Sequence, residues 1–126
     1  MERPLRLKSM NWIHLDSEEK LTEATTASRT KPVVLFKHST TCSISNTALN
    51  RLERNWNSED IADTQAYYLD LLSYRQLSRQ IAEKFQVEHQ SPQVLIIQNE
   101  KSVYDTSHFD INYPTIKAEI EKLLKR

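Results

Sequence analysis

The stretch Pro32-Val33-Val34-Leu35-Phe36-Lys37-His38-Ser39-Thr40-Thr41-Cys42-Ser43-Ile44-Ser45 decides the fold of this 126-residue chain. Its first half, from Val33 to Phe36, is a continuous apolar run rich in β-branched residues. The run is too short for a buried helix, so it predicts a strand that is covered on both faces. A polar turn follows, and the only cysteine of the chain, Cys42, lies where the turn passes into a helix. The remaining elements must therefore build the support for this thiol.

Composition indicates one globular domain and excludes several functional classes. Basic and acidic side chains number 17 each, so no basic field exists to bind a phosphate backbone. Glycine is absent, which excludes the glycine-dependent phosphate loops of most nucleotide-using enzymes. No apolar run approaches the roughly twenty residues of a membrane span, and the charged N-terminus does not read as a secretory signal. With no internal disulfide possible, we expect a cytoplasmic protein that binds neither nucleic acid nor membrane.

Hydrophobic periodicity predicts an alternating order of elements. Residues 1–10 are expected to form a loosely held arm, and residues 11–126 a single domain. Asp16 is expected to cap the first helix, with Glu19 in capping-box position. The order βα–βα–βα–ββ–α predicts an α/β fold, with a central mixed sheet flanked by helices on both faces. The strands are expected over 11–15, 33–36, 66–71, 93–98 and 101–107, and the helices over 16–27, 43–56, 74–85 and from Pro114 onward.

The position of Cys42 favours a reactive thiol over a buried structural one. A lone cysteine is often a small, inert hydrophobic residue. Here Thr41 and Ser43 flank it with polar side chains, so it does not belong to an apolar run. The first turn of a helix also offers free N–H groups and the positive end of the helix dipole, and both stabilise an anion. These features favour the thiolate, which is the nucleophilic form of cysteine.

Two further side chains are candidates for the surroundings of the thiolate. Ser45 lies three residues after Cys42, close to it on the helix surface, and its hydroxyl can donate to the thiolate. It occupies the place where a dithiol enzyme has its resolving cysteine, so disulfide chemistry here must be completed by an outside thiol. His38 ends the strand, and it either contributes charge near the thiolate or has a structural role.

Ser91-Pro92 precedes the second strongly apolar strand. Proline is tolerated at the start of a strand, so simple strand initiation explains it. The alternative is a cis peptide bond next to the active site. The other histidines show no metal-ligand spacing with one another or with Cys42, so no zinc site is predicted.

Read together, these features resemble the thioredoxin fold over roughly residues 11–125. Within that superfamily, the segment 36–45 closely resembles the active-site segment HST-x-C-P-I-S of the monothiol bacilliredoxins. The resemblance implies that Cys42 removes bacillithiol from S-thiolated cytosolic proteins and becomes bacillithiolated itself. Bacillithiol is then a co-substrate, with no bound cofactor. A low-molecular-weight thiol, either free bacillithiol or another, would regenerate Cys42.

The resemblance also carries over roles for individual residues. Ser45 matches the serine of the family, and Pro92 matches the cis-proline of the superfamily, whose neighbouring backbone, here Ser91, pairs with the substrate. Ser43 departs from the pattern because the family has proline there. Serine restores an N–H group and adds a hydroxyl beside Cys42.

Two other functions stay open on the sequence alone. One is a non-catalytic thioredoxin-fold module that binds a partner's extended segment at Ser91–Pro92. The other is iron–sulfur binding in the manner of monothiol glutaredoxins, whose Cys-Gly-Phe-Ser motif is missing here.

Overall fold

The computed structural model describes residues 11–57, 61 and 64–125. The predicted arm, residues 1–10, lies outside the described residues. The order βα–βα–βα–ββ–α is confirmed, with a short 3-10 turn, η2, before the last helix. The elements are β1 (Trp12–His14), α1 (Glu18–Ala27), β2 (Val33–His38), α2 (Ser43–Asn55), β3 (Gln65–Asp70), α3 (Arg75–Phe85), β4 (Gln93–Gln98), β5 (Lys101–Ser107), η2 (His108–Asp110) and α4 (Tyr113–Leu124).

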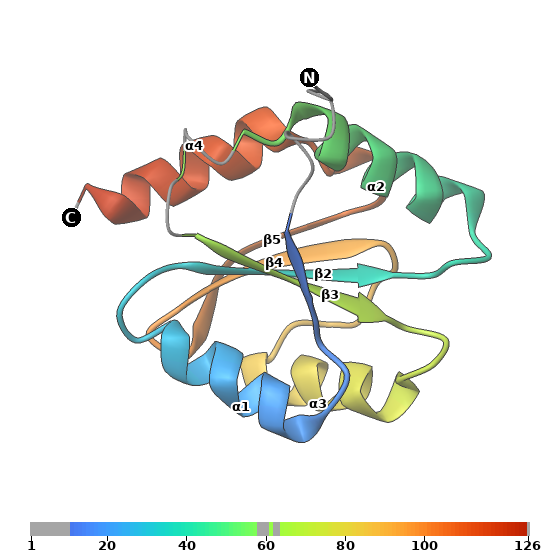
Figure 1. Cartoon of the computed structure of the whole chain (residues 1–126), viewed down its shortest axis with the longest axis horizontal. Helices are drawn as coiled ribbons and strands as arrows, with labels where there is room; N and C mark the ends of the chain where they lie inside the picture. Colours follow the sequence, from blue (N-terminus) through green and yellow to red (C-terminus); the bar gives the residue numbers. More distant parts are fainter. Residues whose placement is uncertain (1–10, 58–60, 62–63, 126) are drawn as a thin grey trace, which may run out of the picture.

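The five strands form one mixed sheet in the order β1-β3-β2-β4-β5. Strands β1, β3 and β2 are parallel, whereas β4 and β5 pair antiparallel as the terminal hairpin. Figure 1 shows α2 and α4 on one face of the sheet and α1 and α3 on the other. The predicted α/β fold with helices on both faces is therefore confirmed.

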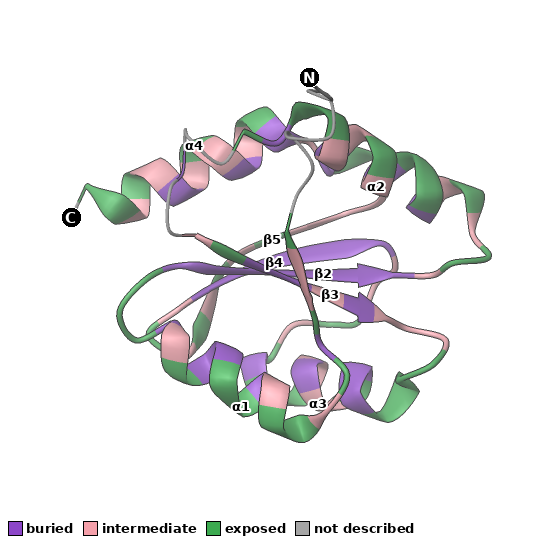
Figure 2. Ribbon diagram, viewed as in Figure 1, coloured by how far each residue is buried: buried purple, intermediate pink, exposed green. Residues whose placement is uncertain are grey.

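The central strand β2 is buried on both faces, as its apolar run predicts. Val34 and Phe36 pack into the core under α2 and α4, whereas Val33 and Leu35 pack into the core under α1 and α3. Each of these side chains is at most 1% exposed. Figure 2 shows the same pattern, with β2 buried and the buried sides of the helices turned toward the sheet. Burying a side chain of this size contributes about 1.5–3 kcal/mol, so β2 stabilises the packing of both helical layers on the sheet.

One end of the sheet gathers the segments that carry the predicted site. At the end of β2, Lys37 pairs with Gln93 at the start of β4. On the other side, the N–H of Leu71, just after β3, donates to the carbonyl of His38 at 2.9 Å. From this end the chain turns through residues 39–42 into α2, at the right of Figure 1.

The predicted cap of the first helix is wrong by one residue. Ser17, not Asp16, is the N-cap of α1, and its hydroxyl accepts a hydrogen bond from the N–H of Lys20 at 3.1 Å. Ser17 has the extended backbone of a capping residue, which places both Glu18 and Glu19 in the first turn of the helix. There the two carboxylates interact favourably with the positive end of the helix dipole. The predicted capping box does not form.

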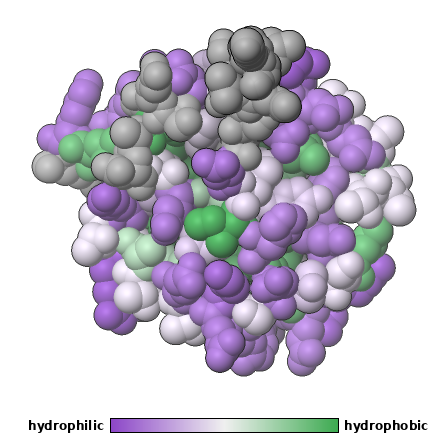
Figure 3. Space-filling view, in the orientation of Figure 1, coloured by the Kyte–Doolittle hydropathy of each residue, from purple (hydrophilic) through white to green (hydrophobic). Residues whose placement is uncertain are grey.

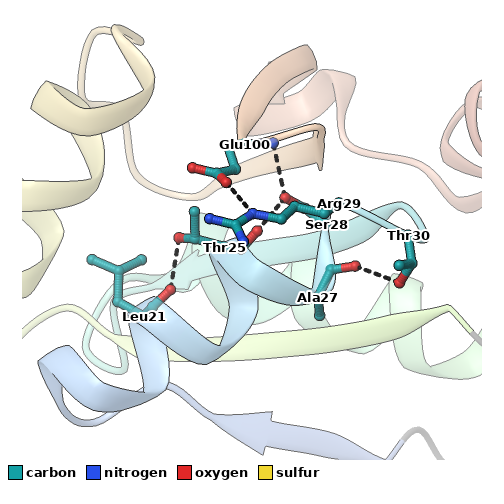
Figure 4. A network of polar contacts seen from close by, with 7 residues as sticks. All are labelled: Leu21, Thr25, Ala27, Ser28, Arg29, Thr30 and Glu100. Carbon is teal, nitrogen blue, oxygen red and sulfur yellow. Dashed lines mark hydrogen bonds and ion pairs between the residues drawn. The ribbon is translucent and has the colours of Figure 1, made fainter.

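A polar network fixes the far end of the sheet (Figure 4). The hydroxyl of Ser28, after α1, accepts from the N–H of Glu100 at 2.9 Å, and Arg29 forms an ion pair with the Glu100 carboxylate. The N–H of Asn99 donates to the Ser28 carbonyl at 2.7 Å. Asn99 and Glu100 both have positive φ, as a tight two-residue hairpin turn requires. The network thus ties the β4–β5 hairpin to α1, at the opposite end from Cys42.

The surface in Figure 3 is mainly hydrophilic, with hydrophobic side chains only in small, separate areas of this face. Among the described residues, no helix combines the length and the apolar character needed to cross a bilayer.

Candidate active site

Cys42 is the N-cap residue of α2 and is partly exposed as a free thiol. Its backbone is held on both sides, because its N–H donates to the Ser39 carbonyl and its carbonyl accepts from the Asn46 N–H. The sulfur makes no capping hydrogen bond to the helix. These backbone bonds thus hold Cys42 at the N-terminal end of α2, where the helix dipole favours an anion.

The predicted residues on either side of Cys42 are exposed. Thr41 ends the turn, and Ser43 is the first residue of α2. At this position the N–H group has no acceptor within the helix, so serine and proline are both compatible with the helix start. The departure from the family pattern at Ser43 is therefore compatible with Cys42 as the N-cap of α2.

Ser45 is fully buried, and His38 and Ser39 engage its hydroxyl. The hydroxyl oxygen lies 2.6 Å from Nδ1 of His38 and accepts a hydrogen bond from the N–H of Ser39 at 3.0 Å. These contacts join the end of β2, the polar turn and the first turn of α2. The predicted hydrogen bond from Ser45 to Cys42 therefore competes with a hydrogen bond from Ser45 to His38, because the hydroxyl has a single hydrogen.

His38 is buried among aromatic rings. Its ring stacks on Phe36 with the centroids 5.8 Å apart and lies 5.6 Å from the ring of Tyr68. Burial lowers the pKa of His38 below its usual value, although the nearby carboxylates of Asp70 and Glu53 act in the opposite direction. Burial therefore favours the neutral form of His38. Of the two roles that the sequence left open, the contact with Ser45 supports the structural one.

The tautomer of His38 decides what Ser45 can do. With the ring proton on Nε2, Ser45 donates its hydrogen to Nδ1. With the proton on Nδ1, His38 donates to the Ser45 oxygen, which accepts from Ser39 as well. Only in the second arrangement is the hydroxyl hydrogen available to the sulfur of Cys42, one helical turn away. His38 thus holds the Ser45 hydroxyl in place and sets the direction of its hydrogen.

The peptide bond between Ser91 and Pro92 is cis. This agrees with the second of the two interpretations of the sequence, a cis bond, rather than with simple strand initiation. Pro92 is buried immediately before β4, and its carbonyl accepts a hydrogen bond from the N–H of His108 at 3.1 Å. The pairing of Gln93 with Lys37 sets this peptide beside the end of β2. Cys42, Ser45, His38 and the Ser91–Pro92 peptide therefore belong to the same end of the sheet.

Sequence reasoning missed a buried lysine at this end. Lys37 is only 1% exposed, and its Nζ lies 3.3 Å from both the carbonyl of Ser78 and Nδ1 of His89. Burial lowers its pKa to about 8. The available signal was a charged residue at an inward-facing position of a strand that is covered on both faces. Gln93, its partner on β4, is equally buried.

No group of three or more His, Cys, Asp or Glu side chains is placed to hold a metal ion in the ranges that the structure describes.

Comparison with known proteins places this arrangement in a family. The family model for the monothiol bacilliredoxin BrxC matches residues 13–116. The chain belongs to this family. The matched region includes every predicted site residue of this bacilliredoxin, from His38 to Pro92.

Solved structures agree with this assignment. A structure provisionally assigned as an oxidoreductase with a thioredoxin fold is 33% identical to the bacilliredoxin, with a TM-score of 0.73. That match covers 86% of this chain and 92% of the other. The thioredoxin of Malassezia sympodialis has a TM-score of 0.70 at 13% identity, covering 89% of this chain and 90% of that one. Thioredoxin f2 of Chlamydomonas reinhardtii has a TM-score of 0.67 at 16% identity, covering 90% and 96%.

The two thioredoxins show a shared fold, so the predicted thioredoxin-like architecture is confirmed. Together with the family, the oxidoreductase neighbour assigns thiol redox chemistry to this bacilliredoxin, as a thiol–disulfide oxidoreductase. With a single cysteine, it is a monothiol protein.

Proposed function

We propose that this bacilliredoxin removes bacillithiol, or a similar low-molecular-weight thiol, from mixed disulfides on cytosolic proteins. The observation that carries the proposal is the partly exposed thiol of Cys42 at the N-cap of α2, in a chain with no second cysteine. A helix N-terminus stabilises the thiolate, and an accessible thiolate attacks disulfides. The family match supports bacillithiol as the adduct.

The reaction proceeds by two thiol–disulfide exchanges. The Cys42 thiolate attacks the bacillithiol sulfur of the mixed disulfide, and the S–S bond to the substrate protein breaks. The substrate leaves as a thiolate and takes a proton from water, while Cys42 carries the bacillithiol. A second thiol, ionised by loss of its proton to water, then attacks this bacillithiol sulfur. It leaves joined to bacillithiol in a disulfide, and Cys42 returns as the thiolate. The disulfide bond to bacillithiol thus passes from Cys42 to the second thiol.

The neighbouring residues assist different parts of this reaction. Ser45 supplies a hydrogen-bond donor when His38 carries its proton on Nδ1, and this bond stabilises the thiolate that each exchange consumes or releases. The backbone at Ser91 and Pro92 pairs with the polypeptide of the substrate. Thr41 and Ser43, both exposed, flank Cys42 at the start of α2.

The proposal is tested with one purified protein carrying bacillithiol, glutathione or coenzyme A on the same cysteine. Release of each adduct is followed by mass spectrometry, with free bacillithiol as the regenerating thiol. We expect the bacillithiol adduct to be released fastest, with bacillithiol appearing on Cys42 as the intermediate. Cys42→Ala should abolish release, whereas Ser43→Ala, which changes an exposed neighbour, should retain it.

Two outcomes would contradict the proposal. Release by Cys42→Ala at the wild-type rate would show that the thiol is not the nucleophile. Binding of the thiolated protein without release, equal in wild type and Cys42→Ser, would indicate the non-catalytic binding module instead.

A further inference from the structure

Lys37 places a cationic side chain in the core, on the face of the sheet opposite to His38. Its contacts are the carbonyl of Ser78 on α3 and Nδ1 of His89, both at 3.3 Å. His89 belongs to the segment 86–92 between α3 and β4, here called the α3–β4 loop. The loop ends in the Ser91–Pro92 peptide. A side chain of β2 therefore holds the loop that carries the predicted substrate-pairing backbone.

Gln93 holds the same loop from the neighbouring strand. Lys37 and Gln93 are direct cross-strand partners, so their side chains project from the same face of the sheet. The amide nitrogen of Gln93 donates to the carbonyl of Glu88 at 3.0 Å, and its amide oxygen accepts from the N–H of Gln90 at 3.3 Å. Two buried polar side chains thus bind three consecutive loop residues, 88 to 90.

Ser91 has no comparable anchor of its own. Its hydroxyl oxygen is buried without a hydrogen-bond partner among the residues that the structure describes. The position of the Ser91 backbone therefore depends on the bonds made just before it, at residues 88–90, and on the strand that begins just after it.

We propose that Lys37 is a positioning residue, which acts through His89 to hold the Ser91–Pro92 backbone where a substrate polypeptide can pair with it. The inference rests on the proposed function. Through the loop, Lys37 would contribute to recognition of the protein part of the mixed disulfide. The inference does not assign a role in the chemistry at Cys42, since Lys37 lies on the other face of the sheet.

The energetics of burial support a role beyond packing. An apolar side chain of similar length, such as methionine, would fill this position without the cost of burying an ammonium group. Among the contacts of Lys37 in the described structure there is no carboxylate to offset that cost. What the lysine provides, and methionine cannot, are the hydrogen bonds to the Ser78 carbonyl and to His89, and only the second reaches the α3–β4 loop.

The test compares Lys37→Met and His89→Ala with the matched control Lys84→Met, which changes an exposed lysine on α3. The substrates are a bacillithiolated protein and hydroxyethyl disulfide, which has no polypeptide. We expect the two loop variants to raise the KM for the protein about threefold to tenfold, as the loss of one hydrogen bond implies. Their kcat and their rate with hydroxyethyl disulfide should equal those of the wild type and of the control.

A second measurement follows the loop without relying on activity. Amide NMR shifts of Gln90 and Ser91 should change in both loop variants and not in Lys84→Met. His89→Ala alters an exposed side chain, so it tests the inference even if Lys37→Met does not fold. An unchanged KM in folded variants would overturn the inference, as would unchanged amide shifts. If the wild type exchanges no mixed disulfide, the proposed function and the substrate-pairing role fail, and the amide shifts then show whether the loop contact alone survives.

Discussion

Nδ1 of His38 lies 2.6 Å from the hydroxyl oxygen of Ser45, and both side chains are buried beneath the turn that carries Cys42. The same oxygen accepts the N–H of Ser39. One hydroxyl therefore joins the end of β2, the turn and the start of α2.

Replacing Ser45 with alanine should destabilise the protein. The change leaves the N–H of Ser39 without its acceptor and the buried Nδ1 of His38 without its partner. An unsatisfied buried polar group costs about 1–3 kcal/mol, and we expect a decrease in the free energy of unfolding within that range. Urea denaturation measures it. Ser43→Ala, an exposed serine of the same helix, should change the value by less than about 0.5 kcal/mol. Equal effects of the two substitutions would show that the buried network contributes nothing.

His38 should make the protein less stable in mild acid. Burial lowers its pKa in the folded state below the usual 6.5, so the unfolded chain takes up this proton at a higher pH than the folded protein does. The His38 contribution is thus present above about pH 6.5 and is lost as the pH falls toward the folded-state pKa. Unfolding free energies of wild type and His38→Gln, measured from pH 7 downward, should converge as the pH falls. His14→Gln, at an exposed histidine, should follow the wild-type curve.

Lys37 should make the stability of the protein depend on pH in the alkaline range. Its pKa is lowered from 10.5 to about 8, so between these values the unfolded chain holds a proton that the folded protein has lost. The free energy of unfolding should therefore rise as the pH increases from about 8. The pKa of Tyr67 is raised from 10.0 to about 12, which lowers stability above pH 10, so pH 8 to 10 is the window to measure. Lys37→Met should remove the rise, and Lys84→Met should keep it.

Gln86, at the C-terminal end of α3, offers a stabilising substitution. It ends α3 with φ 54° and ψ 46°, in the left-handed region that glycine adopts without steric cost. Gln86→Gly should raise the free energy of unfolding by about 0.5–1 kcal/mol in a urea titration. Gln90→Gly, at a nearby position without positive φ, should lower it or leave it unchanged. A loss of stability in Gln86→Gly would refute the explanation from backbone conformation.

The local sequence pattern was sufficient to predict the helices, the strands and the position of the Cys42 thiol. The apolar run in β2 and the change to helical spacing after Cys42 are properties of neighbouring residues, so they are legible without the fold. The cap of α1 was misassigned because Asp16 and Ser17 are adjacent residues that both favour N-caps, and only the backbone shows which one precedes the helix.

The sequence by itself determined an alternating α/β domain with a lone thiol at a helix start, because hydrophobic period and capping are local signals. Tertiary structure alone decided the strand order and the partners of the buried polar groups. His38 meets Ser45 across seven residues, and Lys37 meets His89 across fifty-two. These contacts depend on how β2 pairs with β4 and how the helices cover its two faces, and no periodicity in the chain encodes such a pairing. The thiol could therefore be found in the sequence, whereas the groups that position its neighbours could not.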